Sequence, residues 1–572
     1  MIRVALASCR LSRRRPAVAA GTGRPRDSRG DGGATETRRF VSTDVQPTAP
    51  ASRVASNTSD WERHTHQDKE LVKGLGLTSA TMLVMGSMIG SGIFIVSAEI
   101  SREVASPALL IGAWLITGFL TIVGALTYGE LAAMMPRAGG QYVYLRESLG
   151  PLWGFLYGWT LFLVIQTGTI AAVGVAFGKF LGIFWPAISS SNWIIHIWKV
   201  PKFAVGPMML GGMDVGLNTQ NLVAILVVVA LSIINIFGVK TGAFIQNIFT
   251  TAKVSALLGL VLLGVFLGEN AQALAANFGA NFWRNAGLGT LHDVGGGSGV
   301  SVLVSTLTVL AIAQVGSLFS ADAWNNVTFT AGEVKNPSRN LPLSLALGTG
   351  VVIALYVACN FIYLGALPLV GSPTGTTLLE RGIQFAKEDR VATAVMTQMF
   401  GSAGGALMAV AIMISGFGCC NGLILSGARV YYAMAKDGLF FRSVARLHPA
   451  YKTPAVSLMV QMVWTCVLCI SGSYGQLLDY IIFAVLVFYI LTIVGLFVLR
   501  RTHPEAERPY KAVGYPILPA VYIVMALFID IVLLRYKPQY TWPGLFIVLL
   551  GIPVYYAWNL RQKAPATAQS IP

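Results

Sequence analysis

Runs of about 20 apolar residues recur from Leu75 to about residue 560, and they constrain the fold more than any other feature of the chain. Each run is long enough to cross the hydrocarbon core of a bilayer as one α-helix. Only 12% of the 572 residues are charged, against about 25% in soluble domains. The sequence therefore predicts an all-α integral membrane protein. We expect about twelve transmembrane helices, near residues 76–99, 107–134, 151–181, 220–238, 242–268, 301–330, 341–365, 396–434, 454–471, 476–499, 515–535 and 541–560.

The N-terminal tail and a few short connections carry much of the net charge of +16, so this charge does not indicate a nucleic-acid partner. Residues 1–70 are rich in Arg, Gly and Ala and lack apolar periodicity, which predicts a disordered basic tail. A transit peptide or a misassigned start are alternatives for this tail. We expect a transmembrane domain over 71–563 and a short tail over 564–572.

Lys and Arg are concentrated in the even-numbered connections, which predicts that both tails are cytoplasmic, in a plasma membrane or a bacterial inner membrane. One such connection, 136–150, is too polar to span and contains Tyr142 and Tyr144. We expect a short interfacial helix there, with its tyrosines at the membrane surface.

The six cysteines do not form the pattern of a disulfide framework, because five of them fall inside apolar spans. Cys466 and Cys469 have a redox or zinc spacing. Because they fall inside a membrane helix and no histidine is nearby, packing of small residues is the better interpretation. Hydrolase, zinc-protease and P-loop motifs are missing from the sequence. We therefore expect no enzyme activity, no catalytic residues, no cofactor and no metal.

The first span, in the stretch Thr81–Ser97, is interrupted by the glycine and serine cluster at 86–92. Glycine weakens a helix interior, and freed backbone at membrane depth is tolerated only where it is buried in protein or lines a cavity. A broken helix can offer its half-helix N-terminus to an anion and unwound carbonyls to a cation. The alternative is a small-residue packing face between helices.

A second interruption falls in the sixth span, where Asp322 stands among Ser320, Asn325 and Asn326. An acid inside a span indicates a functional site, although it could also cap or pair locally near a helix end. The two interrupted spans lie five spans apart, as expected for two inverted five-helix repeats whose broken helices meet at a ligand site. In the fifth span, Lys253 either snorkels to the surface or places its ammonium near the breaks.

Several motifs in this order resemble the amino acid–polyamine–organocation superfamily, and most closely its L-type amino acid transporter branch with its bacterial relatives. The resemblance covers about 71–560, and the motifs are GSMIGSGIF from Gly86, YGEL from Tyr128, GGQYVYLRE from Gly139, FSADAWN from Phe319 and GEVKNP from Gly332. It implies a LeuT-like five-plus-five inverted repeat with two further C-terminal helices. It also implies an amino acid permease that works by alternating access, by sodium-independent exchange or facilitated transport of L-amino acids.

Site residues follow from the resemblance, position by position. It implies that amides around Ser91, Gly92 and Ile93 hold the substrate carboxylate, which agrees with the positive end of a half-helix. It places the α-ammonium at carbonyls of Met88 or Ile89 and of Phe319 and Asp322. Phe319 corresponds to an aromatic residue that closes over the substrate. The implied binding set is completed by Gly90, Trp324 and Asn325.

Two further positions have implied roles outside the carboxylate and ammonium contacts. Lys253 corresponds to a lysine that stands where sodium-coupled relatives bind Na⁺. Asn421 falls at a motif in the eighth span and is either structural or lines the substrate pocket.

Two departures from the family pattern limit what is transferred. Asp322 stands where some relatives have glycine, so it either favours cationic substrates or ties the unwound segment together. Residues 182–219 contain no cysteine, so we expect no disulfide-linked heavy chain. The expected partners are a small L-amino acid and the lipid bilayer. A polyamine or organic-cation carrier and a membrane nutrient receptor without flux are the alternatives.

Overall fold

The computed structural model describes residues 68, 70–206, 208–284, 299–472 and 474–563. The predicted C-terminal tail lies outside the described residues. So does the predicted N-terminal tail, apart from residues 68 and 70. Everything described belongs to one compact unit.

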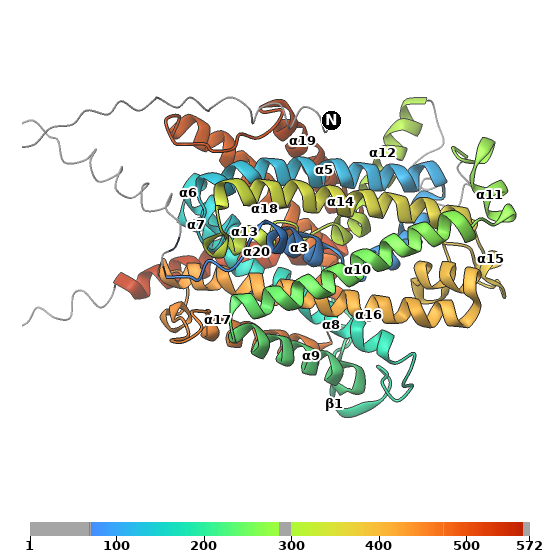
Figure 1. The fold of residues 1–572 in the computed structure, drawn as a ribbon, viewed down its shortest axis with the longest axis horizontal. Helices are drawn as coiled ribbons and strands as arrows, with labels where there is room; N and C mark the ends of the chain where they lie inside the picture. Colours follow the sequence, from blue (N-terminus) through green and yellow to red (C-terminus); the bar gives the residue numbers. More distant parts are fainter. Residues whose placement is uncertain (1–67, 69, 207, 285–298, 473, 564–572) are drawn as a thin grey trace, which may run out of the picture. The chain divides into compact units, whose positions relative to one another are not determined.

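Long helices dominate this unit (Figure 1). Those that correspond to the predicted spans are α3 Leu77–Met88 with α4 Val96–Val104, α5 Pro107–Met134, α7 Pro151–Thr160 with α8 Gln166–Leu181, α9 Thr219–Ile236, α10 Val239–Leu267, α12 Gly299–Ser320 with α13 Asn326–Phe329, α14 Pro337–Ala366, α16 Val391–Lys436, α17 Ala455–Ser471, α18 Tyr474–Thr502, α19 Ile517–Tyr536 and α20 Pro538–Lys563. The prediction of an all-α membrane protein with about twelve spans is confirmed. Ten of the described helices are long and apolar enough to cross a membrane, and α3 and α17 are shorter apolar helices.

Short elements connect the spans. They are α6 Gln141–Leu149, α11 Ala271–Asn277, α15 Leu378–Arg381, the π-helical turn η2 Leu161–Ile165, and the 3₁₀ turns η1 Gly92–Phe94, η3 Gly279–Asn281, η5 Ala331–Glu333, η6 Lys387–Asp389 and η7 Arg442–Ala445. The connection between α8 and α9 holds two small antiparallel pairs that the sequence did not predict. In these pairs β1 Trp193–Lys199 lies against β4 Asp214–Asn218, and β2 Phe203–Val205 against β3 Met208–Leu210.

The helix α6 confirms a short helix in the connection 136–150, but its tyrosines do not face outward to a membrane surface as expected. Tyr142 and Tyr144 are buried in the protein, where α6 packs against α7 and α18. The Tyr142 hydroxyl donates to Asp437 Oδ2 at 2.9 Å, which holds α6 against the end of α16. The expectation failed because a tyrosine with a buried acceptor gains a hydrogen bond and apolar contacts together.

The long helix α16 begins five residues before the predicted span and contains one break in its backbone. Gly401 has φ of 62°, a left-handed conformation that glycine adopts without a steric penalty. This break lies ten residues after the start of α16, and the helix continues from it to Lys436.

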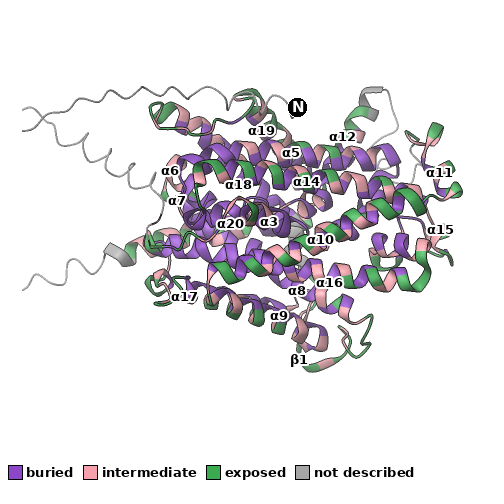
Figure 2. Cartoon of the chain, viewed as in Figure 1, coloured by how far each residue is buried: buried purple, intermediate pink, exposed green. Residues whose placement is uncertain are grey.

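The core lies where α3, α4 and α12 meet their neighbours. Helix α14 packs against α5 and α3, α16 packs against α10 and α8, and α12 packs against α4. Burial concentrates along these helices, whereas α9 and α10 alternate buried and exposed positions (Figure 2). The outer face of α10 exposes large apolar side chains such as Leu258, Leu262 and Phe266. Such a face is stable in contact with lipid rather than with water.

Candidate functional site

The first predicted break is present, between α3 and α4. Regular helix ends at Met88 and resumes at Val96, with one 3₁₀ turn between them. A Cβ atom on Gly92 would lie 2.3 Å from Ser320 Oγ, at the end of α12. The backbone of the first break therefore touches the second break, and only glycine permits this approach.

The second predicted break is also present, between α12 and α13. It contains Ala323 with φ of 65°, which an L-residue rarely adopts. The Tyr356 hydroxyl of α14 lies 3.2 Å from Met88 O and 3.1 Å from Ser320 O. The carboxyl ends of the two half-helices α3 and α12 thus meet at one side chain.

Side-chain donors occupy the carbonyl groups of the first break. Lys253 Nζ donates to Gly86 O and Ile89 O at 2.8 Å, and to Ser415 O at 3.0 Å. Lys253 is fully buried, so the inward orientation, rather than snorkelling, is the one present. The hydroxyl of Ser415 approaches Ile89 O at 3.1 Å and Gly90 O at 2.9 Å.

The amide groups that follow are free. Within the described part of the chain, the backbone N–H groups of Ser91, Gly92 and Ile93 donate to no acceptor. They open the second half of the broken helix, where unsatisfied donors and the helix dipole attract negative charge. The first break therefore offers donors to a ligand, while the protein's own side chains already bond to its acceptors.

The second break offers the opposite polarity. The carbonyl oxygens of Ala321 and Asp322 accept no hydrogen bond from any described residue, and they follow the negative end of α12. Phe319 O accepts only from the Asp322 amide, at 3.3 Å. Because Met88 O and Ile89 O already bond to side chains, the second break presents the freer acceptors for an ammonium group.

Asp322 lies between two small cavities. Its Oδ1 accepts a hydrogen bond from the Tyr489 hydroxyl of α18 at 2.6 Å. The cavities on either side measure about 20 Å³ and 10 Å³. A cavity needs about 10–15 Å³ to hold a single water, so neither cavity accommodates an amino acid without a rearrangement.

The remaining predicted residues are distributed unevenly around these cavities. Trp324 lines the smaller cavity and packs edge-on against Tyr128, with ring centroids 4.8 Å apart. Asn325 lines the larger cavity and donates to Gln141 Oε1 at 2.7 Å. Phe319 is half-buried and lines neither cavity.

The six first-break residues Met88 to Ile93 also line neither cavity. The structure thus joins the two breaks through Gly92 and Tyr356, but it does not join the first break to the cavities beside Asp322.

Asn421 has a structural environment in this conformation. Its amide donates to Gly242 O at 3.1 Å and to Gln246 Oε1 at 2.8 Å, and its Oδ1 accepts from Asn235. These bonds tie α16 to α10 and α9, and Asn421 lines neither cavity beside Asp322.

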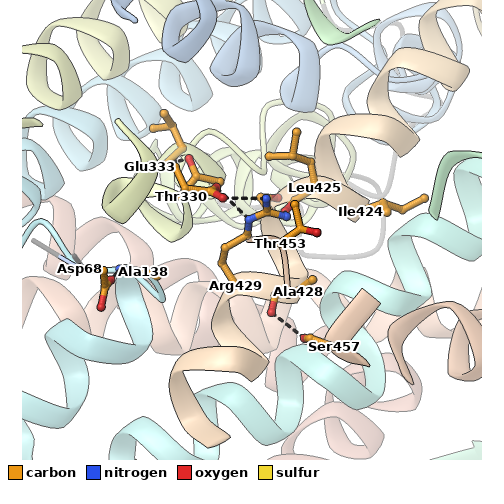
Figure 3. A network of polar contacts seen from close by, with 12 residues as sticks. Asp68, Ala138, Thr330, Glu333, Ile424, Leu425, Ala428, Arg429, Thr453 and Ser457 are labelled. Carbon is orange, nitrogen blue, oxygen red and sulfur yellow. Dashed lines mark hydrogen bonds and ion pairs between the residues drawn. The ribbon is translucent and has the colours of Figure 1, made fainter. Parts of the chain in front are cut away.

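A buried ion pair fixes the segment after the second break (Figure 3). Arg429 of α16 donates from Nε and Nη2 to the two carboxylate oxygens of Glu333, each at 3.0 Å, and both side chains are buried. The same segment forms a parallel bridge with the start of the first span. Leu75 N donates to Glu333 O at 3.0 Å, and Lys335 N to Leu75 O at 2.8 Å. The ends of both broken helices are therefore tied together on this side.

Sequence reasoning missed the residues that organise the breaks from other helices. Tyr356, Ser415 and Tyr489 are ordinary residues of apolar spans, and nothing in their local sequence indicates a role. Only the polarity of Ser415 in an apolar stretch could have drawn attention.

The fold and the two broken helices define a multi-pass membrane transporter. A family model described as "Amino acid permease" matches residues 75–555, which is most of the chain. The chain belongs to this family of amino acid permeases. This assignment confirms the resemblance to the amino acid–polyamine–organocation superfamily and the prediction of a transporter rather than an enzyme.

Curated relatives match the chain over 82–100% of their own length. The chain is 29% identical to the serine/threonine exchanger SteT of Bacillus subtilis, covering 88% of this chain and 100% of that protein. It is 27% identical to the b(0,+)-type amino acid transporter 1 of Mus musculus, covering 88% of this chain and 94% of that protein. It is also 27% identical to the human large neutral amino acids transporter small subunit 2, covering 86% of this chain and 82% of that protein.

Proposed function

We propose that this permease exchanges L-amino acids across the membrane by alternating access, without sodium. The observation that carries the proposal is the division of polarity between the breaks. Free donors at Ser91, Gly92 and Ile93 suit a carboxylate, and free acceptors at Ala321 and Asp322 suit an ammonium. An α-amino acid carries both groups at a fixed, short separation.

The same division disfavours a polyamine carrier of this fold. A polyamine has no anionic group for the three amides of the first break, and it would leave them unsatisfied when the site closes. An unsatisfied buried donor costs about 1–3 kcal/mol. A receptor without flux uses the same contacts, so binding does not distinguish it and a transport assay is required.

Independence from sodium rests on Lys253. Its ammonium bonds to three carbonyl oxygens from α3, the first break and α16 at 2.8–3.0 Å, and unwound carbonyls of this kind coordinate cations in related folds. We propose that the lysine supplies this positive charge permanently. A second cation at the same place would be repelled.

We propose neutral L-amino acids as the substrates, with serine and threonine as the first to test. The relative of B. subtilis is named as a serine/threonine exchanger, and the human relative as a transporter of large neutral amino acids. The Asp322 carboxylate accepts a hydrogen bond from Tyr489. This supports the role in which Asp322 ties the unwound segment together, rather than the role in which it attracts a cationic side chain.

Alternating access requires the site to enlarge, because the cavities beside Asp322 hold only water-sized volumes. We propose that α3 and the segment Ala331–Lys335 move together, since the bridge through Leu75 joins them. We further propose a transporter domain over 71–563, tails over 1–70 and 564–572, and cytoplasmic locations for both tails.

We propose that no heavy chain is attached through the connection 182–219, because its sequence has no cysteine. The word "subunit" in a relative's name belongs to that relative. Non-reducing electrophoresis of the protein in its native membrane tests this point, and a band that shifts on reduction would contradict it.

Counterflow into proteoliposomes tests the proposed function. Vesicles are loaded with unlabelled serine, threonine, leucine, lysine or glutamate, and uptake of each labelled amino acid is measured without Na⁺ at symmetric pH. We expect uptake of a neutral L-amino acid that depends on internal amino acid. Saturable binding without counterflow would favour the receptor, and uptake of a decarboxylated analogue equal to that of its parent would favour the polyamine carrier.

A further inference from the structure

A larger, apolar cavity lies apart from the broken helices. It is lined by α7, η2, α17, α20 and the end of α16 with residues 439–441, and it measures about 410 Å³. This volume is within the range of small-molecule sites, about 300–1,000 Å³. Its aromatic walls include Phe155, Trp159, Phe162, Phe440, Phe441 and Trp558.

The cavity walls have no polar group left for a ligand. The two indole N–H groups are used inside the protein, by Trp159 toward Ile547 O at 3.1 Å and by Trp558 toward Gly438 O at 2.9 Å. All other lining side chains are apolar. An occupant of this cavity is therefore held by apolar contact alone, which excludes an amino acid or another polar solute.

Part of the cavity wall lies on the exposed apolar surface of the bundle. Phe441 at its rim is 58% exposed, and on α20 the neighbouring Tyr556 and Leu560 are 56% and 70% exposed. Acyl chains cover exposed apolar side chains of a membrane-spanning helix. The molecules that can reach the cavity directly are thus those of the bilayer.

Free positive charge lies next to the rim. Phe441 is followed by Arg442, and Arg446 comes one turn later; both are exposed, and neither side chain forms an ion pair or hydrogen bond with a described residue. The nearby Asp437 carboxylate is already paired with Arg146 at 2.7 Å. An unpaired guanidinium at the membrane surface binds phosphate well.

We propose that this cavity binds one acyl chain of an anionic glycerophospholipid, with the lipid phosphate held by Arg442. The side of the membrane agrees with this choice. Arg442 lies in a connection that the Lys and Arg distribution assigns to the cytoplasm, and anionic lipids are abundant in the cytoplasmic leaflet. The site is separate from the proposed amino acid site and does not depend on its assignment.

Photo-crosslinking in vesicles tests the proposal. The protein is reconstituted in phosphatidylcholine with a small fraction of phosphatidylglycerol that carries a diazirine on one acyl chain, and labelled peptides are mapped by mass spectrometry. We expect label in the peptides that contain Trp159, Phe441 and Trp558. Unlabelled phosphatidylglycerol should compete and phosphatidylcholine should not.

Two variants separate the chain from the headgroup. Arg442→Gln should reduce labelling about fivefold, since one basic residue near an anionic surface contributes about that factor. Arg339→Gln at the start of α14, also an exposed arginine on the same predicted side, should leave labelling unchanged. Ala557→Trp should fill the cavity and abolish labelling at these peptides.

Label spread evenly over lipid-facing helices, or equal competition by both lipids, would overturn the proposal. Label in the cavity that Arg442→Gln does not reduce would also overturn it, because the phosphate contact would then be absent. Counterflow of amino acids is measured on the same samples, so a failure of the proposed transport function is seen independently.

Discussion

Lys253 gives the sharpest prediction, because one buried side chain organises the backbone of the first break. Lys253→Met keeps most of the length of the side chain and removes its charge and all three hydrogen bonds. These bonds reach Gly86 O, Ile89 O and Ser415 O at 2.8, 2.8 and 3.0 Å. A hydrogen bond from a charged donor contributes about 1.5–3 kcal/mol, and the carbonyls left behind are buried.

Even if water or backbone relaxation offsets half of the loss, about 3 kcal/mol remains. Ile89 is two residues before the free amides, so this loss acts on the backbone that we propose holds the substrate carboxylate. We expect the apparent affinity for the best amino acid to fall more than 100-fold. We also expect that 100 mM Na⁺ does not restore Lys253→Met, whereas it partly restores Lys253→Ala, whose shorter side chain leaves room for an ion among the three carbonyls.

The assay is binding of labelled substrate to purified protein, with thermal stability measured in parallel. The matched control is Lys240→Met, which removes an exposed lysine from the same helix α10 and should change affinity less than twofold. Affinity of Lys253→Met within a few-fold of the wild type, in a folded protein, would refute the reasoning.

Three further substitutions test the contacts between the breaks and their supports. Gly92→Ala should abolish transport, because the new Cβ would lie 2.3 Å from a side-chain oxygen of the second break; counterflow measures this. Glu333→Gln should destabilise the protein by about 3–5 kcal/mol, because it leaves a buried guanidinium without its counter-charge; the midpoint of thermal unfolding reports it. Tyr489→Phe should free the Asp322 carboxylate and raise uptake of lysine relative to serine at least about tenfold, since it removes a charge-assisted hydrogen bond.

Each of these has a control and an opposing outcome. Gly90→Ala should be tolerated, since its Cβ would lie 3.4 Å from Cys419 Sγ, an ordinary contact; equal loss in both glycine variants would contradict the argument. Glu505→Gln removes an exposed carboxylate and should leave the unfolding midpoint unchanged, so an equal shift would argue against the ion pair. An unchanged lysine-to-serine ratio in Tyr489→Phe would show that Asp322 does not face the substrate side chain.

The sequence predicted the spans well, because the bilayer sets both their length and their apolar character. The helix α5 begins and ends at the predicted residues 107 and 134. Both breaks were also predictable, since Gly90 and Gly92 in one span and Asp322 in another have no place in a lipid-facing helix.

The sequence could not show which distant side chains complete the breaks. Tyr356 and Ser415 lie hundreds of residues from the first break, and only packing brings them to its carbonyls. The orientation of Lys253 was equally open, because one residue on a long helix can face lipid or protein. For the same reason the burial of Tyr142 was missed, since its acceptor Asp437 belongs to another span.

The central claim is that the first break binds a carboxylate through free amides, and competition by a matched series of analogues tests it most directly. The amino acid that is best transported in counterflow is compared with its methyl ester and its decarboxylated amine as inhibitors of binding. The amine loses two or three charge-assisted hydrogen bonds and should bind more than about 100-fold more weakly. The ester keeps a neutral carbonyl acceptor but loses the charge, and it should bind at least about tenfold more weakly. An amine that competes as well as its parent amino acid would contradict the account.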